Sequence, residues 1–228
     1  MRIVVVSSPG AGTSVHWSHA AALELARVLL LGGARVEWLA AATPGHELPL
    51  ALPGVVAGAV STCATTPVHR VTAGMTDLEL EVALSRSLRS RPAHAVVHFG
   101  TGARGSPNVL WLADRLGSAV FAVVRAAEVV CQRGDLVDFA GEPCPVFDDP
   151  ERCRRCCGPS RWSRPRTVEF RNRIDLLAGG LLVTKAVFVP DPADVQPLVT
   201  AGVPRHLLVP THTASAIADR VLARAPVQ

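Results

Sequence analysis

Short runs of apolar, largely β-branched residues alternate with helical segments along almost the whole chain, and this alternation limits the fold more than any other feature. Strands are predicted at 3–7, 35–40, 68–72, 95–99, 120–124, 186–190 and 206–210. Helices are predicted at 20–31, 76–90, 108–116, 167–177, 193–201 and 214–224. Because a strand–helix–strand unit sets its strands parallel, the sequence predicts an α/β fold with one Rossmann-like, doubly wound, mostly parallel sheet over residues 1–228. The Pro- and Gly-rich segment 43–67 is predicted to be irregular.

The composition is that of a globular protein. The chain has 228 residues, of which 49% are hydrophobic and 18% are charged, so it can bury a sizeable core. No stretch reaches the roughly 18 to 20 apolar residues of a membrane span, and no secretory leader precedes the first strand. We therefore expect a cytoplasmic protein. The net charge of +4 is mild, and we expect no nucleic-acid partner.

Five of the six cysteines lie within residues 131–157, where they interrupt the alternation of strands and helices. Cys153 and Cys156 have the short hairpin spacing that presents two thiolates to one tetrahedral metal ion. We expect an inserted metal loop in which four thiolates hold one structural Zn²⁺: Cys131, Cys144, Cys153 and Cys156. Cys157 is the reserve ligand if Cys144 is too distant. The alternatives are a reduced, metal-free cluster or two disulfides, and a cytoplasmic setting disfavours disulfides.

Ligands of open parallel sheets bind beyond the carboxyl ends of the strands, so the loop after the first strand is a candidate site. Residues 8–14 of this loop are glycine-rich. Gly10 and Gly12 would let backbone N–H groups approach an anion or a sugar. The loop matches neither a Walker loop nor a full dinucleotide fingerprint, and a tight turn between strand and helix is the alternative.

Three histidines are candidates at the same edge of the sheet. His16 and His19 lie three residues apart at the start of the first helix, where they could contact a base or a sugar hydroxyl. A solvated or capping role is the alternative for both. His98 ends its strand, and its side chain is predicted to point toward the same mouth.

Residues 100–105 match the pattern GxGxxG between a strand and a helix. Glu128 follows about twenty residues later, which is where such folds contact a ribose. The motif follows a middle strand rather than the first, so a dinucleotide-dependent oxidoreductase is only a minor alternative. Gly100 is a candidate ligand-binding residue.

Arginines gather after the cysteine segment. Arg164 and Arg166 lie close to Trp162, and Arg171 and Arg173 continue into the next helix. Guanidinium forks suit phosphate oxygens, and a tryptophan beside them suits a membrane interface. We expect this face to meet either a phosphate-bearing lipid-linked acceptor at the membrane surface or an acidic partner subunit. The alternative is a solvated helix face with local carboxylate neighbours.

The cysteine segment reads Cys-Gln-Arg-Gly-Asp-Leu at 131–136, Glu-Pro-Cys at 142–144 and Glu-Arg-Cys-Arg-Arg-Cys at 151–156. It resembles the Cys-Pro-Arg-Gly-x-Leu … Cys … Lys-Cys-x-x-Cys insertion of some GT-B glycosyltransferases of family 4. The tail at 186–210 is similar to the end of that family's N-terminal domain. The resemblance spans nearly the whole chain and implies the acceptor-side, Rossmann-like domain of such an enzyme.

The chain departs from that family's pattern at three places. Residues 125–128 read Arg-Ala-Ala-Glu where the family has His-Asp, Asp191 replaces a serine, and residues 211–212 read Thr-His instead of Asn-Gly. Glu128 is the carboxylate closest to the family's histidine, so we name it as the candidate base or acceptor-hydroxyl ligand. No counterpart of the donor-binding domain follows, so we expect that domain on a separate subunit.

The resemblance therefore implies the acceptor-side half of a glycosyltransferase, working as a heteromer with a donor-binding partner. We expect the chain alone to be inactive and to bind a nucleotide sugar only with that partner. We also expect it to lie at the inner face of the membrane as a peripheral protein. The alternative is a non-catalytic, zinc-stabilised binding or scaffold module that has kept the fold.

Overall fold

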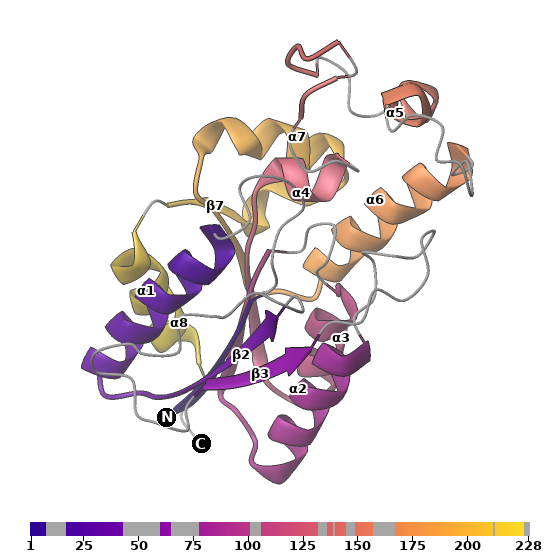
Figure 1. The fold of residues 1–228 in the computed structure, drawn as a ribbon. Helices are drawn as coiled ribbons and strands as arrows, with labels where there is room; N and C mark the ends of the chain where they lie inside the picture. Colours follow the sequence, from indigo (N-terminus) through magenta and orange to yellow (C-terminus); the bar gives the residue numbers. More distant parts are fainter. Residues whose placement is uncertain are drawn as a thin grey trace.

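The computed structural model describes residues 1–7, 17–42, 60–64, 78–100, 106–131, 136–138, 140–144, 149–156, 167–211 and 213–225. They form one seven-stranded sheet in which all neighbouring strands are parallel, in the order β3-β2-β1-β4-β5-β6-β7 (Figure 1). The strands are β1 (Arg2–Ser7), β2 (Arg35–Ala42), β3 (Val60–Ala64), β4 (Ala95–Phe99), β5 (Ala119–Val123), β6 (Ala186–Val189) and β7 (Leu208–Pro210).

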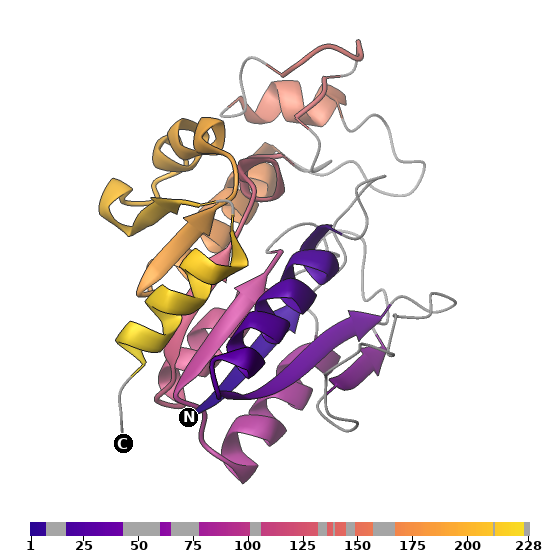
Figure 2. The same ribbon diagram turned by 90° about the vertical axis from the view of Figure 1, so that its left-hand side faces the viewer.

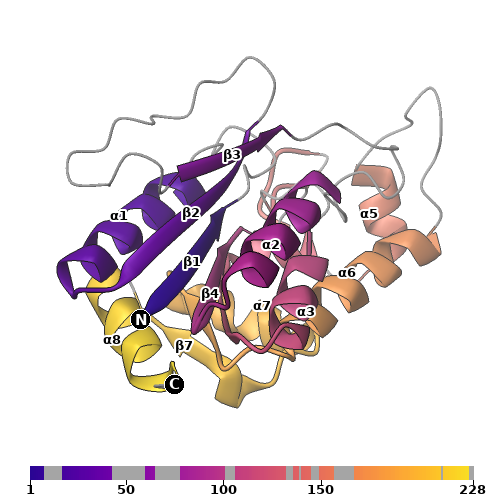
Figure 3. The ribbon, with the colours of Figure 1, turned by 90° about the horizontal axis from the view of Figure 1, so that it is seen from below.

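Helices cover both faces of the sheet, because parallel strands with continuous apolar sequences must be buried on both sides. One face carries α1 (Trp17–Leu31) and α8 (Ala214–Arg224). The other face carries α2 (Leu78–Ser90), α3 (Asn108–Arg115) and α6 (Thr167–Leu181), as Figure 3 shows. Successive side chains of β1 enter the two cores in turn: Val5 faces α1, whereas Val4 and Val6 face the α2 side.

Four short helical elements lie near the carboxyl ends of β5 and β6 or precede β7. They are α4 (Ala126–Val130), the 3₁₀ turn η1 (Pro192–Asp194), α7 (Val195–Thr200) and the 3₁₀ turn η2 (Arg205–Leu207). The remaining helix, α5 (Pro150–Cys156), packs against α6 and stands away from the sheet (Figures 1 and 2). None of the helices in the described ranges is both long enough and apolar enough to cross a bilayer.

The structure confirms the predicted α/β fold and its doubly wound parallel sheet. The strand predicted at 95–99 and the helix predicted at 214–224 coincide with β4 and α8. The elements that were not predicted are β3, which lies in the segment expected to be irregular, the short helices α4 and α5, and the 3₁₀ turn η2. The strand predicted at 206–210 begins two residues later, at β7. The strand predicted at 68–72 lies outside the described residues.

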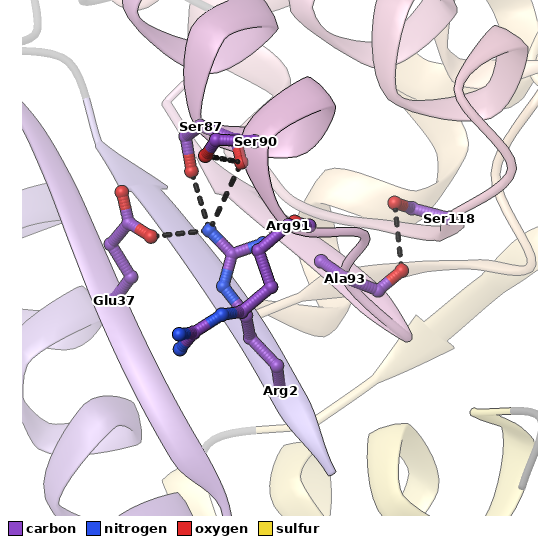
Figure 4. Close-up of polar contacts among 7 residues, drawn as sticks. All are labelled: Arg2, Glu37, Ser87, Ser90, Arg91, Ala93 and Ser118. Atoms are coloured by element: carbon purple, nitrogen blue, oxygen red, sulfur yellow. Dashed lines mark hydrogen bonds and ion pairs between the residues drawn. The ribbon is translucent and has the colours of Figure 1, made fainter. Parts of the chain in front are cut away.

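A buried arginine ties the strands together at the amino edge of the sheet (Figure 4). Arg2 is 8% exposed, and its guanidinium donates to the Glu37 carboxylate, to the Ser87 hydroxyl at 2.6 Å and to the Arg91 carbonyl. Its backbone N–H donates to His94 Nδ1 at 3.1 Å. This cluster joins β1, β2 and the end of α2 at the edge opposite the candidate site, so its role is structural.

The carboxyl edge contains a topological switch point between β1 and β4. β1 leads to β2 and β3 on one side, whereas β4 leads to β5, β6 and β7 on the other. The helices that follow β1 and β4 therefore cover opposite faces, and ligands of such sheets bind beyond the carboxyl ends of the strands at this point. Ser7, His98 and Gly100 lie at this edge.

Candidate functional site

Glu128 is the central polar residue of the candidate site. It belongs to α4, directly beyond β5, and is only 4% exposed. Trp17 Nε1, at the start of α1, donates to Glu128 Oε1 at 2.8 Å. The Arg125 backbone N–H donates to Glu128 Oε2 at 3.4 Å, and the Glu128 N–H donates back to the Arg125 carbonyl at 3.0 Å. The hydrogen bond from Trp17 to Glu128 thus joins the start of α1 to α4, across 111 residues of sequence.

Burial raises the pKa of Glu128 from its ordinary value of 4.5 to about 7. The hydrogen bonds from Trp17 and the Arg125 backbone and the positive charge of Arg125 act in the opposite direction, because they favour the carboxylate. Near neutral pH the group therefore divides between its acid and its base form. That is the condition under which a carboxyl serves best as a general acid or base.

Two further charged residues, Arg125 and Asp194, lie next to Glu128. The Arg125 guanidinium lies over the Trp17 ring, 5.6 Å from its centroid. Asp194, at the end of η1, accepts a hydrogen bond from the Ala126 backbone N–H, and burial raises the pKa of its carboxyl. Asp191 caps η1 by accepting from the Ala193 N–H at 2.9 Å.

Arg173 does not belong to an exposed basic face. It is 3% exposed, and its guanidinium donates to the Glu128 carbonyl at 2.7 Å and to the Val129 carbonyl at 2.9 Å. The prediction that placed it with Arg171 on a surface for anionic partners was wrong for Arg173, since α6 turns this side chain inward. Arg171 is exposed. Arg164 and Arg166 lie outside the described residues, so their prediction stays a prediction.

His19 is part of the core rather than a solvated residue. It is 4% exposed, and its Nδ1 lies 2.7 Å from Ser7 Oγ, which also accepts from Trp38 Nε1 at 2.8 Å. Because a hydroxyl has one proton and two acceptor lone pairs, the tautomer of His19 sets the direction of its bond with Ser7 Oγ. This network fixes the first turn of α1, two residues after Trp17. Gly10, Gly12 and His16 lie outside the described residues.

His98 is fully buried, and neither ring nitrogen has a hydrogen-bond partner within the described ranges. It lies in register with Val6 and Ala122, on the face covered by α2 and α3. Burial lowers the pKa of His98 to about 4, so the ring is neutral at neutral pH. The ring is enclosed, contrary to the predicted orientation toward the mouth. That His98 binds a ligand stays a prediction.

Gly100 allows the chain to turn sharply at the end of β4. Its φ of +73° lies in the left-handed region that favours glycine, and its N–H donates to the Val123 carbonyl at 3.2 Å. Of the GxGxxG pattern only Gly100 falls within the described residues, and the oxidoreductase alternative is not favoured.

The cysteine segment begins at the end of α4. Cys131 ends this helix, and its N–H donates to the Ala127 carbonyl at 3.1 Å. An antiparallel bridge joins Val137 to Pro143. Asp138 accepts from Arg152 at 2.8 Å and so ties this turn to α5. Hydrogen bonds from two backbone N–H groups and the nearby Arg152 lower the pKa of Asp138.

Cys153 and Cys156 lie on α5, so the predicted hairpin at this spacing was wrong. The helix begins after Asp149, whose carboxylate accepts from two backbone N–H groups of its first turn. Cys131, Cys144, Cys153 and Cys156 are half-buried thiols, and Cys156 Sγ lies 3.6 Å from the Val137 carbonyl oxygen. Over the described part of the chain, no three His, Cys, Asp or Glu side chains are arranged to hold a metal. The zinc site therefore stays a prediction.

No protein-family model matches this sequence, and no curated protein matches it either. Solved structures with a similar fold include UDP-GlcNAc 2-epimerase from Neisseria meningitidis bound to UDP-GlcNAc, at 11% identity and a TM-score of 0.47. Acinetobacter baumannii MurG has 16% identity and a TM-score of 0.45. Arabidopsis thaliana UGT89C1 complexed with UDP has 13% identity and a TM-score of 0.42.

The likeness covers 97%, 92% and 92% of this chain but only 48%, 46% and 52% of those three proteins, respectively. The chain thus spans about half the length of the structures that it matches. At these identities and TM-scores the likeness assigns the chain to no family. It gives no support to the cysteine insertion as a mark of glycosyltransferase family 4.

Proposed function

We propose that this chain is the acceptor-side half of a sugar-transfer enzyme of the GT-B type and that a separate donor-binding domain completes it. The observation that carries the proposal is the environment of Glu128. A carboxyl that titrates near neutral pH, at the carboxyl edge of a doubly wound sheet, is suited to take a proton from an acceptor hydroxyl. Glu128 also stands closest to the position of the histidine in the resembling family.

In this proposal each residue near Glu128 has a defined task. Glu128 accepts the proton of the acceptor hydroxyl as that oxygen bonds to the sugar carbon. The bond from this carbon to the phosphate oxygen of the nucleotide sugar breaks in the same step, and the nucleotide leaves from the donor-binding domain. Trp17 holds Oε1 at 2.8 Å, and Oε2, which has the longer bond of 3.4 Å from the Arg125 N–H, takes the proton. The nucleotide sugar requires the second domain, because both substrates must be held at near-attack distance. The chain alone forms only one wall of that cleft.

The experiment is a nucleotide-release assay with a panel of UDP- and GDP-sugars. The chain is assayed alone and together with a donor-binding domain supplied as a separate protein, for which a lone donor domain encoded by a neighbouring gene would be the first choice. We expect no turnover by the chain alone and turnover by the pair. We also expect Glu128→Gln to lower the rate by a factor of about 10² to 10⁴. Glu24→Gln, an exposed carboxylate on α1, is the matched control and should keep the full rate. Full activity of the Glu128→Gln pair would exclude Glu128 as the base, and a pair without turnover would favour the non-catalytic scaffold.

We further propose that the thiolates of Cys131, Cys144, Cys153 and Cys156 hold one structural zinc ion, with Cys157 in reserve. The support is the sequence pattern and the position of two of these cysteines one turn apart on α5. Protein purified without chelator should contain about one zinc per chain, in line with a four-thiolate site. Less than about half an equivalent would contradict the proposal.

Finally, we propose that Arg164 and Arg166 contact an anionic partner, either the phosphate of a lipid-linked acceptor at the inner face of the membrane or an acidic surface of the donor subunit. The support is the density of arginines beside Trp162 in the sequence. Charge reversal at both arginines should weaken binding to anionic liposomes or association with the partner subunit. If both are unchanged, the arginines belong to a solvated face.

A further inference from the structure

One buried arginine holds the backbone of the residue that carries the site carboxyl. Arg173 lies on α6, is 3% exposed and donates to two consecutive carbonyls of α4, those of Glu128 and Val129. The last carbonyls of a helix have no partner within the helix. The planar guanidinium offers several N–H groups in a fixed fork, which suits two neighbouring carbonyls better than the single ammonium of a lysine would.

The position of α4 depends on such contacts. The helix has five residues, and a helix this short has no stability of its own in water. Hydrogen bonds tie it to three elements: to α1 through the bond from Trp17 to Glu128, to η1 through the bond from Ala126 to Asp194, and to α6 through Arg173. Of these three ties, the one from Arg173 acts on the main chain of Glu128 itself.

We propose that Arg173 is a positioning residue, which fixes the main chain of Glu128 so that its carboxyl stays buried against Trp17. Arg173 touches no substrate in this scheme and acts through Glu128. Its importance for catalysis rests on the proposed function, whereas the positioning itself does not. α6 is also the helix against which α5 packs, so the same helix links the cysteine segment to the site.

The competing explanation is that Arg173 merely stabilises the fold. A purely structural arginine would change the stability of the protein and leave the environment of Glu128 in the folded state as it is. A positioning arginine would change that environment, because a displaced α4 lets water reach the carboxyl and loosens its bond to Trp17. The two explanations therefore predict different pH dependences for the indole N–H of Trp17, which is bonded to the Glu128 carboxyl.

The test follows the indole N–H resonances of the protein by ¹H–¹⁵N NMR as a function of pH. The chain has four tryptophans, and the resonance of Trp17 is assigned by its loss in Trp17→Phe. In the unaltered protein this resonance should shift with a midpoint near pH 7, the pKa of Glu128. Arg125 and Asp194, the other charged groups that act on Glu128, are the same in every Arg173 variant.

Arg173→Met should lower that midpoint by about one pH unit or more, a tenfold change in the protonation equilibrium, because the carboxyl becomes hydrated. Arg173→Lys should lower it in the same direction, and it decides the question if the methionine variant does not fold. Arg171→Met removes the same charge from an exposed position of the same helix and should leave the midpoint unchanged. A midpoint that stays at its original value in both Arg173 variants, whatever their stability, would overturn the proposal.

The measurement uses no sugar transfer. A lowered midpoint would therefore support the positioning role even if the proposed transferase activity were disproved. Conversely, an unchanged midpoint would overturn the positioning role and leave the proposed activity standing.

Discussion

The free energy of unfolding of the unaltered protein should contain a contribution from Glu128 that is lost as the pH rises from 4.5 to about 7, and Glu128→Gln should remove that loss. The pKa of the carboxyl is about 7 in the folded protein and 4.5 ordinarily, so the folded state holds a proton that the unfolded state releases between these values. The stabilisation is fully present below pH 4.5 and is lost as the pH rises through about 7. A pKa difference of about 2.5 corresponds to about 3 kcal/mol. Gln stays neutral, keeps an acceptor for Trp17 and therefore escapes this loss.

In the unaltered protein, the titration of His98 offsets the contribution of Glu128 to the free energy of unfolding. Its pKa is about 4 when folded and 6.5 ordinarily, so it stabilises the folded state increasingly as the pH rises through the same range. The two contributions have opposite signs and similar sizes, and they nearly cancel. Only the difference between variant and parent shows either of them, because every other titrating group drops out of that difference.

The assay is urea unfolding of the parent and of Glu128→Gln at pH values between 4.5 and 8. The difference in the free energy of unfolding should change by about 3 kcal/mol over this range, with the glutamine variant more stable at high pH. Glu24→Gln, on the exposed side of α1, should give a flat difference. A flat difference for Glu128→Gln would mean that the carboxyl is not buried as described, and the reasoning would fail.

Three further predictions use the same unfolding measurement. His98→Leu should be about 3 kcal/mol less sensitive to acid than the parent between pH 6.5 and 4, because it has no ring to protonate; an unchanged acid response would contradict this. Arg2→Met should lower the free energy of unfolding by about 3 kcal/mol or more, because it leaves the partly buried Glu37 carboxylate without its ion pair. The control Arg27→Met, at an exposed ion pair, should lower it little, and equal losses in the two variants would contradict the prediction. Ser7→Ala should cost about 1–3 kcal/mol, since Trp38 and His19 lose their shared partner, and the exposed Ser90→Ala should stay within about 0.5 kcal/mol.

The sheet was predictable because its strands are buried on both faces. Continuous apolar runs such as that of β5 must be covered on both faces, and the intervening helices then require parallel strands. β3 was missed because residues rich in Pro and Gly surround it. α4 and α5 were missed because five and seven residues are too few to show a helical period.

The candidate site was predictable only in part. Glu128 was found from the sequence, but its partner Trp17 was not, because the helix was predicted to begin at residue 20. Arg171 and Arg173 look alike in the sequence, yet one is exposed and the other buried. A signal was present: Arg173, Leu177 and Leu181 recur at intervals of four, and both leucines are buried. The contacts that set the environment of Glu128 come from α1, α6 and η1, which no local pattern relates to one another.

The pH dependence of kcat/KM for sugar transfer, measured on the chain together with its donor-binding partner, tests the central claim most directly. We predict that the rate rises with pH through a midpoint near 7, the pKa of Glu128, because the base must be ionised to accept the proton. Glu128→Gln should abolish that rise together with most of the rate, and the chain without its partner should show no transfer. Robust transfer by the chain alone, or a profile that Glu128→Gln leaves unchanged, would contradict the account.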